Sequence, residues 1–546
     1  MSQSNIHHIS FGHPEIGNIT GRKVGDVVQF LGVKYASLRH WFDNPTLCTY
    51  DGRGIAADHH GPQAISSPEG VDNELTAIQK HLPKPEFPGI SGTECLNLNI
   101  VAPASSKASN ALPVLVYIHG GGFSVGANWW PQFDMKRIVQ VSIDIGKPII
   151  GINVNYRLGA SGFMTSKELR QAGYKSNRGL HDQVVALRWV QQYISGFGGD
   201  PRQVTVSGES VGGRKCYQNR TIEGASNLKV VSATRLMYRE EALASRIVVM
   251  GGAPPSVSPL TSEVAEFAYR SIIEAWGIDG LSPEKRLESL EGLNSLDLHH
   301  KIQDLPILPA LDDDLVPYHE SFEFMASQEY VFKAKQLEGA MIVFSPLDAS
   351  IFAFMGLFAA RKSIAADFEA HLHATLAQYP EAAQQVLETY GISAGLDDET
   401  ALLRVLQFGS DIGHQAAAQA LADRFPGDVF LMEFSEPNPW EGPFKGHSTH
   451  ILDVAFLLQN FNDHLDKTQS ASAVQFAKDV ISFAYGEKPW KPFSSARGTS
   501  ILQAGRRQYF EGEQATSKRY RELLHIAETT GLDSLLSTWT AFLFAG

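Results

Sequence analysis

Short, almost continuous apolar runs recur along the chain and predict the strands of a buried sheet. They lie at residues 27–35, 114–118, 148–154, 204–206, 247–250, 341–344 and 430–433. Runs of this length that are apolar at nearly every position are typical of parallel strands covered on both faces. The pattern therefore predicts a large parallel sheet inside an α/β protein.

Helical patterns separate and follow these runs. Between the strands at 148–154 and 204–206, residues 179–194 place apolar side chains on one face, which supports a packed helix. The strand–helix–strand order predicts a parallel sheet with crossover connections. Two Ala/Glu/Leu-rich segments, at about 259–304 and 359–425, are expected to be helical insertions over one end of the sheet, and residues 517–544 are expected to be mostly helical.

Composition narrows the class of protein. The chain has 546 residues, of which 43% are hydrophobic, and a formal net charge of −13. A chain of this size can form one large α/β domain spanning residues 1–546, or two to three smaller ones. The negative charge argues against a nucleic-acid partner and against an anionic membrane surface. No uninterrupted apolar run approaches the roughly 18 residues of a membrane-spanning helix, so no membrane span is expected.

The amino-terminal residues and the cysteines predict a cytoplasmic location. The first 20 residues have neither a basic start nor an apolar stretch typical of a secretion signal. The three cysteines, Cys48, Cys95 and Cys216, are too few and odd in number for a fold built on disulfides.

The strongest chemical signal follows the run at 204–206. Gly208-Glu209-Ser210-Val211-Gly212 has the G-x-S-x-G spacing of a sharp strand-to-helix turn that presents a serine hydroxyl above a sheet. An ordinary Gly/Ser turn is the alternative. A phosphate-binding P-loop does not fit, because the lysine comes one residue late and no Ser or Thr follows it.

A serine nucleophile needs a base, an acid that orients the base, and hydrogen-bond donors for the oxyanion. The strand at 114–118 ends in a glycine loop, His119-Gly120-Gly121-Gly122-Phe123. The N–H groups of Gly121 and Gly122 are candidate oxyanion-hole donors, together with that of Val211, directly after the serine.

Four segments, VYIHGGGF, NYRLGASGF, GLHDQVVALRWVQQYISGFGGDP and VTVSGESVGG, resemble the type-B carboxylesterase/lipase family, which includes the cholinesterases. Residues 30–36, 94–98 and 490–493 are similar to further family segments, so the resemblance spans nearly the whole chain. It implies the α/β-hydrolase fold, with a large, mostly parallel central sheet flanked by helices and with helical insertions over the active-site end.

The resemblance also implies the acid and the base. LDASIF at 347–352 places Asp348 at the acid position, where the family more often has glutamate, and HILDVAF at 450–456 makes His450 the base. His447 is the rival base. A metal pair of His447 and His450 with Asp453 is a further alternative. Glu209 is expected to be a buried supporting acid.

Departures from the family pattern bear on location and substrate. Ala64 follows Gly61-Pro62-Gln63 where the family has a cysteine, so Cys95 lacks its usual disulfide partner. We expect the loop at 64–94 to be untied as a result. The loop contains no tryptophan, which cholinesterases use there to bind a quaternary ammonium, so a choline ester is not the expected substrate.

Residues 214–231 form an atypical insertion directly after the candidate elbow, where the family's helix begins. The segment matches nothing in the family, and residues 232–237 look like that helix displaced downstream. Arg214-Lys215-Cys216 and Val230-Val231 can be encoded with splice-site-like sequences, so a retained short intron in the gene model is one hypothesis and a genuine surface insertion is the other.

Together these features predict a serine carboxylic-ester hydrolase that forms an acyl-enzyme on a neutral small-molecule or lipid-like ester, with no cofactor and no metal. The alternatives are an acyltransferase with the same triad, a family member impaired by the 214–231 insertion, and a non-catalytic binding protein.

Overall fold

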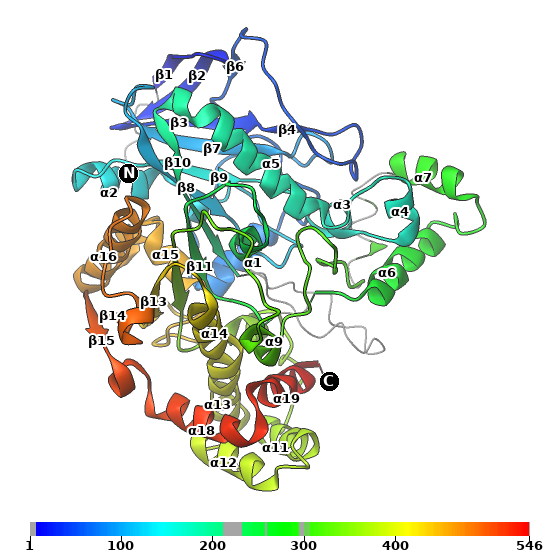
Figure 1. Ribbon diagram of the computed structural model, residues 1–546, viewed down its shortest axis with the longest axis vertical. Coiled ribbons are helices and arrows are strands. Elements are labelled where there is room, and N and C mark those ends of the chain that lie inside the picture. The colour runs from blue at the N-terminus through cyan, green and yellow to red at the C-terminus, as the bar shows by residue number, and fades with distance from the viewer. Residues whose placement is uncertain are drawn as a thin grey trace.

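The computed structural model describes residues 7–210, 232–256, 259–293, 297, 301–302 and 305–544. Within these residues one large sheet has the strand order β1-β2-β3-β7-β9-β8-β10-β11-β12-β13-β14-β15, and β6 pairs with β2 (Figure 1). The strands are β1 (His7–His13), β2 (Gly17–Val24), β3 (Val27–Lys34), β6 (Ile55–Ala56), β7 (Asn97–Pro103), β8 (Leu112–Ile118), β9 (Ile150–Val154), β10 (Gly199–Glu209), β11 (Arg246–Met250), β12 (Gly339–Phe344), β13 (Asp428–Phe434), β14 (Thr499–Gln503) and β15 (Arg506–Phe510).

The centre of the sheet is parallel and its two sides are antiparallel. Neighbours from β9 through β8, β10, β11, β12 and β13 to β14 pair in parallel. The pairs among β1, β2, β3, β7 and β9, and the pair β14–β15, are antiparallel. Every predicted strand is present, so the prediction of a large, mostly parallel sheet in an α/β protein is confirmed.

Helices cover both faces of the sheet, which explains why its central strands are apolar throughout. Along β8, Val114 and Val116 pack into the cluster that contains α5 (Arg178–Tyr193). The alternate residues Leu115 and Tyr117 pack into the opposite cluster with α2 (Lys136–Asp144), α15 (Leu452–Leu457) and α16 (Lys467–Ala484). Because successive side chains of a strand point to opposite faces, both sets have to be apolar.

The two Ala/Glu/Leu-rich segments are helical. The first contains α6 (Ser262–Ala275) and α7 (Pro283–Glu291). The second contains α11 (Ile364–Thr375), α12 (Pro380–Tyr390), α13 (Asp398–Ser410), the π-helical turn η4 (Asp411–Gln415) and α14 (Ala416–Arg424). The helices α11, α12 and α13 gather with α18 (Lys518–Thr530) and α19 (Leu532–Phe544) at the end of the molecule opposite β1 and β2 (Figure 1), around an apolar cluster of their own. We call α11–α14, α18 and α19 the helical cap.

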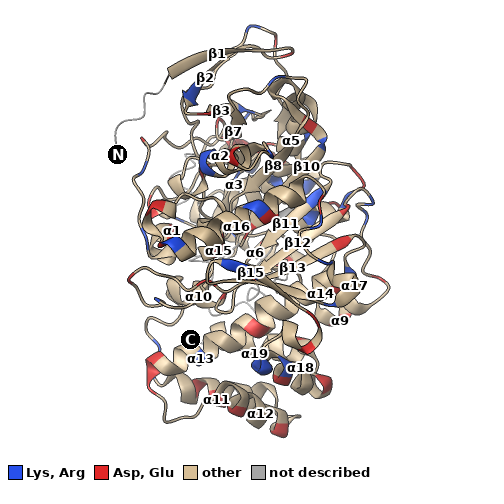
Figure 2. Ribbon diagram, turned by 90° about the vertical axis from the view of Figure 1, so that its left-hand side faces the viewer, with Lys and Arg blue, Asp and Glu red and all other residues tan. Residues whose placement is uncertain are grey.

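Positions of Lys, Arg, Asp and Glu are interspersed along the ribbon in Figure 2, and several Asp and Glu positions lie on α11, α12 and α18. No helix in the part of the chain that the structure describes has the length and apolarity needed to cross a membrane.

No disulfide at Cys95 ties the loop at 64–94, but hydrogen bonds close it. Cys95 is buried and free of a disulfide, as predicted. Backbone hydrogen bonds close the loop instead: the Gln63 N–H donates to the Gly89 carbonyl at 3.0 Å, and the Ser91 N–H donates to the Gln63 carbonyl at 3.0 Å. The Trp129 indole N–H also donates to the Gln63 side chain at 2.8 Å, which joins this closure to the protein interior.

The predicted insertion at 214–231 lies outside the described residues, and so does Cys216. The chain is described again from η3 (Ser232–Tyr238), a 3₁₀ helix at the position where we predicted the displaced elbow helix. Two of its side chains are held by the buried Glu320. Arg235 forms an ion pair with this carboxylate at 3.1 Å, and the Tyr238 hydroxyl donates a hydrogen bond to it.

Candidate active site

Ser210 stands at the end of β10 in a backbone conformation that few residues adopt. Its φ is +35°, in the left-handed region, and the residue is buried. The Ser210 N–H donates to the Met250 carbonyl at 3.1 Å, which ties the turn to β11. This is the strained strand-end geometry predicted for the G-x-S-x-G segment. Val211, the third predicted oxyanion donor, lies outside the described residues.

The glycine loop after β8 lies directly against this turn. A Cβ atom on Gly120 would come within 2.6 Å of the Glu209 carbonyl oxygen, so only glycine allows this approach. The backbone amides of Gly121 and Gly122 donate no hydrogen bond to any described residue. Two adjacent N–H donors without a protein acceptor, next to a serine, are what an oxyanion hole requires.

Buried polar groups lie beside the glycine loop and at α5. His119 stacks on Tyr156, with ring centroids 4.6 Å apart, and burial lowers the pKa of His119 to about 4. A neutral ring in this position has a structural role. Arg157 and Asp182 form a fully buried bidentate ion pair, with N–O distances of 2.8 and 2.7 Å.

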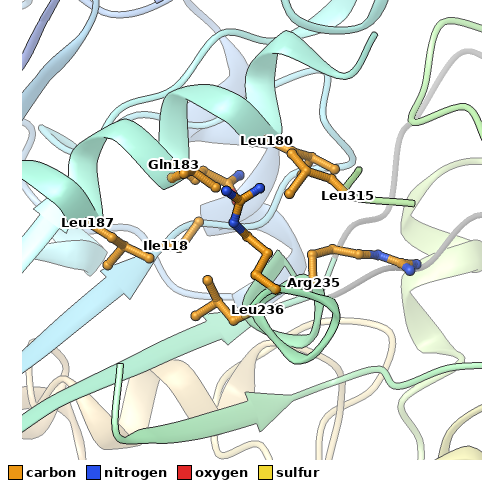
Figure 3. A pocket seen from close by; sticks show the side chains of 9 residues that line it. Ile118, Leu180, Gln183, Leu187, Arg235, Leu236 and Leu315 are labelled. Carbon is orange, nitrogen blue, oxygen red and sulfur yellow. The ribbon is translucent and has the colours of Figure 1, made fainter. Parts of the chain in front are cut away.

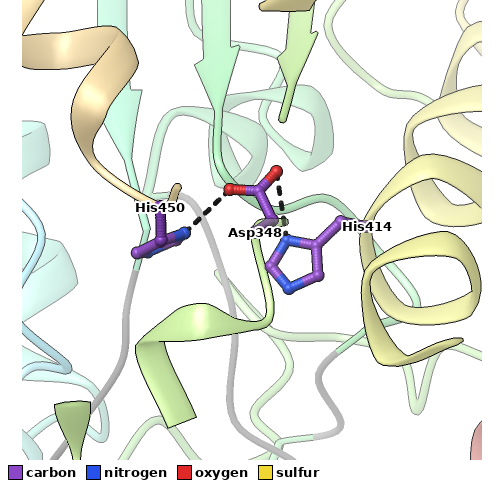
Figure 4. Close-up of side chains that lie close together, drawn as sticks. All are labelled: Asp348, His414 and His450. Carbon is purple, nitrogen blue, oxygen red and sulfur yellow. Dashed lines mark hydrogen bonds and ion pairs between the residues drawn. The ribbon is translucent and has the colours of Figure 1, made fainter. Parts of the chain in front are cut away.

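The structure brings Asp348 and His450 together, although they are far apart in the sequence. Asp348 lies in the turn after β12, and His450 lies just before α15. The Nδ1 atom of His450 is 2.9 Å from Oδ1 of Asp348, and both side chains are almost completely buried (Figure 4). The Ser350 hydroxyl accepts the His450 backbone N–H at 3.1 Å, which holds the two loops in register.

Glu209 contacts the other side of the same imidazole ring. Its Oε1 atom is 3.0 Å from Nε2 of His450, and Gly251 leaves room for both, since a Cβ there would lie 2.8 Å from the ring. Among the described residues the Ser210 side chain and the His450 ring share no hydrogen bond. Glu209 is thus the buried acid predicted beside the serine, but it takes the position facing Nε2.

The two carboxylates determine the charge state of His450. Burial by itself would lower the pKa of His450, but the charge of Glu209 and the hydrogen bond to Asp348 oppose this and raise it to about 9. For Asp348 the effect of burial has the opposite sign and would raise the pKa. His414 and His450 together outweigh it and hold the pKa of Asp348 well below its ordinary value. These contacts favour an ionised Asp348 beside a protonated His450.

His414, from η4 of the helical cap, is a residue that sequence reasoning missed. Its Nδ1 atom lies 3.5 Å from Oδ2 of Asp348, and its ring meets the His450 ring edge-on at 5.9 Å (Figure 4). No family segment contains it, and its helical surroundings resemble any buried helix. Only the presence of a histidine in a buried run of α13–α14 could have drawn attention to it.

Asp348, His414 and His450 form the only group of three possible metal-ligand side chains with atoms within 4.8 Å of one another among the described residues. A metal ion bound there would replace the hydrogen bond between Asp348 and Nδ1 of His450. The alternative of His447, His450 and Asp453 does not form such a group. His447 is part-exposed, and its backbone bonds to Phe444 and Asn438 hold the preceding loop.

A separate, mostly apolar cavity lies between α5 and η3 (Figure 3). It is lined by Leu180, Gln183, Val184 and Leu187 of α5, by Arg235 and Leu236 of η3, and by Ile118, Arg239 and Leu315. None of the candidate catalytic residues lines it. Ile118 connects it to the site, because this residue directly precedes the glycine loop.

Comparisons with known proteins identify the family. The sequence model of the carboxylesterase family matches residues 8–519. Secreted triacylglycerol lipase LIP1 of Gibberella zeae is 31% identical over 293 residues, which are 51% of this chain and 46% of that protein. Lipase 3 of Yarrowia lipolytica is 25% identical over 492 residues, 87% of this chain and 88% of that protein. The match to LIP1 thus spans about half the length of that relative.

Solved structures show the same fold. A thermophilic PNB esterase has a TM-score of 0.67 at 21% identity, covering 95% of this chain and 100% of that chain. Aspergillus niger EstA has a TM-score of 0.70 at 19% identity, covering 98% and 99%. This likeness confirms the predicted α/β-hydrolase fold. The relative named as secreted does not favour the predicted cytoplasmic location.

Proposed function

The chain belongs to the carboxylesterase family, and we propose that it hydrolyses carboxylic esters with Ser210 as nucleophile, His450 as base and Asp348 as the acid that orients the base. The observation that carries this proposal is the buried contact of 2.9 Å between Asp348 and His450, close to a serine held at positive φ. The resemblance to type-B carboxylesterases and lipases, read from the sequence, is confirmed.

In the proposed reaction Ser210 Oγ attacks the ester carbonyl carbon while Nε2 of His450 takes the hydroxyl proton. The amides of Gly121 and Gly122, with that of Val211, bind the oxyanion. His450 then gives the proton to the leaving alcohol, and water hydrolyses the acyl-enzyme by the same steps. Because Nε2 faces Glu209 in the structure, the base has to be neutral and its ring has to turn toward Ser210 before it can act.

The proposed substrate is a neutral small-molecule or lipid-like ester. Glu209 and Asp348 are buried against His450, and these acids disfavour an anionic substrate at the reacting carbonyl. Relatives named as lipases support a lipid-like acyl group. Transfer of the acyl group to another alcohol uses the same triad and is the second candidate function.

We expect the pH dependence of kcat/KM to report the contact between Glu209 and His450. The base acts in its neutral form, and the pKa of His450 is raised to about 9. The value of kcat/KM should therefore rise with pH along an acid limb whose midpoint lies above the ordinary histidine pKa of about 6.5. Glu209→Gln removes the charge that faces Nε2, so the limb should move to lower pH. A wild-type limb at or below about 6.5, or one that Glu209→Gln leaves in place, would contradict this assignment.

The proposed function is tested with a fluorophosphonate probe and a panel of p-nitrophenyl esters from acetate to palmitate. We expect the probe to label Ser210, as shown by peptide mass mapping, and the panel to give a preferred acyl length. Labelling without turnover in water, but with turnover when an acceptor alcohol is added, would favour acyl transfer. Neither labelling nor turnover would show an impaired or non-catalytic member, and the chain shortened across 214–231 would then distinguish these two.

A further inference from the structure

The helical cap reaches the candidate catalytic acid through the turn η4. There α13 and α14 are joined by a π-helical turn rather than by regular α-helix. Such turns shift the register of a helix by one residue and often occur at functional sites. The His414 side chain of this turn points toward Asp348 (Figure 4).

Packing fixes how the helix around η4 is rotated. Trp539 of α19 lies so close to α13 that a Cβ on Gly409 would come within 2.3 Å of its ring, so only glycine fits there. The Ser256 hydroxyl donates to the Gly413 carbonyl, which holds the same turn from the side of the sheet. Ser410 accepts the Ala349 N–H at 3.0 Å, so the helix also contacts the backbone directly after the acid.

Each oxygen of Asp348 has its own partners. Oδ1 faces Nδ1 of His450 at 2.9 Å. Oδ2 accepts the Ser345 N–H at 2.7 Å and faces Nδ1 of His414 at 3.5 Å. Because Asp348 and His414 are each about 1% exposed, water does not solvate the far oxygen, and the protein has to supply its donors.

We propose that His414 is a positioning residue, which holds Oδ2 of Asp348 so that Oδ1 stays directed at His450. The proposal rests on the proposed function, in which Asp348 is the acid that orients the base. His414 touches neither substrate nor the reacting atoms and acts only through Asp348. Because the π-helical turn of the helical cap carries His414, the cap helps to fix the position of the catalytic acid.

The pKa of Asp348 agrees with this role. Burial would raise the pKa of a carboxyl group in this position, and the neighbouring imidazoles of His414 and His450 reverse that effect. His414 therefore supports the ionised form of Asp348, which is the form that orients and stabilises a protonated His450.

The test compares two substitutions at one position, measured on the full chain with a p-nitrophenyl ester. Asn at 414 can place an amide donor near the position of Nδ1, whereas Leu fills a similar volume without a donor. We expect His414→Leu to lower kcat about 10- to 100-fold with little change in KM, and His414→Asn to restore most of kcat. His525→Leu, at an exposed histidine of α18, is the matched control and should leave kcat unchanged.

A double-mutant cycle separates positioning from packing. If His414 acts through Asp348, His414→Leu should have little further effect in the Asp348→Asn background, because the carboxylate is gone. Equal losses for His414→Asn and His414→Leu, or full additivity with Asp348→Asn, would overturn the proposal. Should His414→Leu not fold, His414→Ala, which only removes atoms, takes its place.

The outcomes also separate this proposal from the function on which it rests. An inactive Asp348→Asn variant together with a fully active His414→Leu variant refutes the role of His414 and leaves the triad intact. An active Asp348→Asn variant refutes Asp348 as the acid, and with it the positioning role of His414.

Discussion

Ser210→Ala should abolish ester hydrolysis, with a loss on the order of 10⁴-fold or more in kcat. The variant lacks the oxygen that forms the acyl-enzyme, while the oxyanion donors and the acid–base pair remain. We expect the protein to stay folded, because alanine has the same Cβ as serine at the positive φ of this position and no hydrogen bond between the Ser210 side chain and a described residue is lost.

The measurement is steady-state hydrolysis of the preferred p-nitrophenyl ester, with thermal unfolding as the check on folding. Ser393→Ala, at an exposed turn between α12 and α13, is the matched control and should behave as wild type. Residual activity above about 1% of wild type, or fluorophosphonate labelling of another serine in Ser210→Ala, would show that the nucleophile lies elsewhere.

Substitution of His450 should have the second-largest effect. His450→Ala is expected to be inactive, again by on the order of 10⁴-fold or more, whereas His447→Ala should keep substantial activity. His450→Ala also leaves two buried carboxylates, Asp348 and Glu209, facing a void without the cation between them. Leaving a buried charge uncompensated costs about 3–5 kcal/mol, so this variant should also unfold at a lower temperature.

His450→Asn separates the two consequences. Its amide can still donate to Asp348 near the position of Nδ1, so it should be more stable than His450→Ala, but it carries no base. The matched variant His447→Asn should remain active. An active His450→Asn together with an inactive His447→Asn would mean that His447 is the base and that the segment at 450–456 has been misaligned with the family.

Much of the fold could be predicted because its signal is local. The central parallel strands are buried on both faces, so each appears as an apolar run. The antiparallel strands β1 and β2 were not predicted, since exposed and half-buried residues alternate along them and their sequences contain as many polar as apolar residues. The strands β14 and β15, TSILQ and RRQYF, were missed because polar residues outnumber apolar ones in each, so neither shows an apolar run.

Some features of the site could likewise be predicted from the sequence, and others could not. The glycines and Ser210 could be inferred because their motifs need particular residue types at a particular spacing, and the acid and base positions could be inferred from the resemblance to the family. The contact of Glu209 with Nε2 of His450 could not, since adjacency to Ser210 in the sequence does not say which way a side chain points. Nor could the closure of the loop at 64–94 through Gln63, because its hydrogen bonds come from the backbone, which every residue type shares.

By itself, the sequence determined the class of fold, the nucleophile turn and the two residues expected to act with it, because backbone conformation and chemical identity are properties of short segments. Only the tertiary structure decided what surrounds them. His414 meets Asp348 because a π-helical turn, the glycine at 409 and Trp539 set the rotation of a cap helix. Such contacts depend on the packing of segments far apart in the chain, so the pattern of residues within one segment cannot predict them.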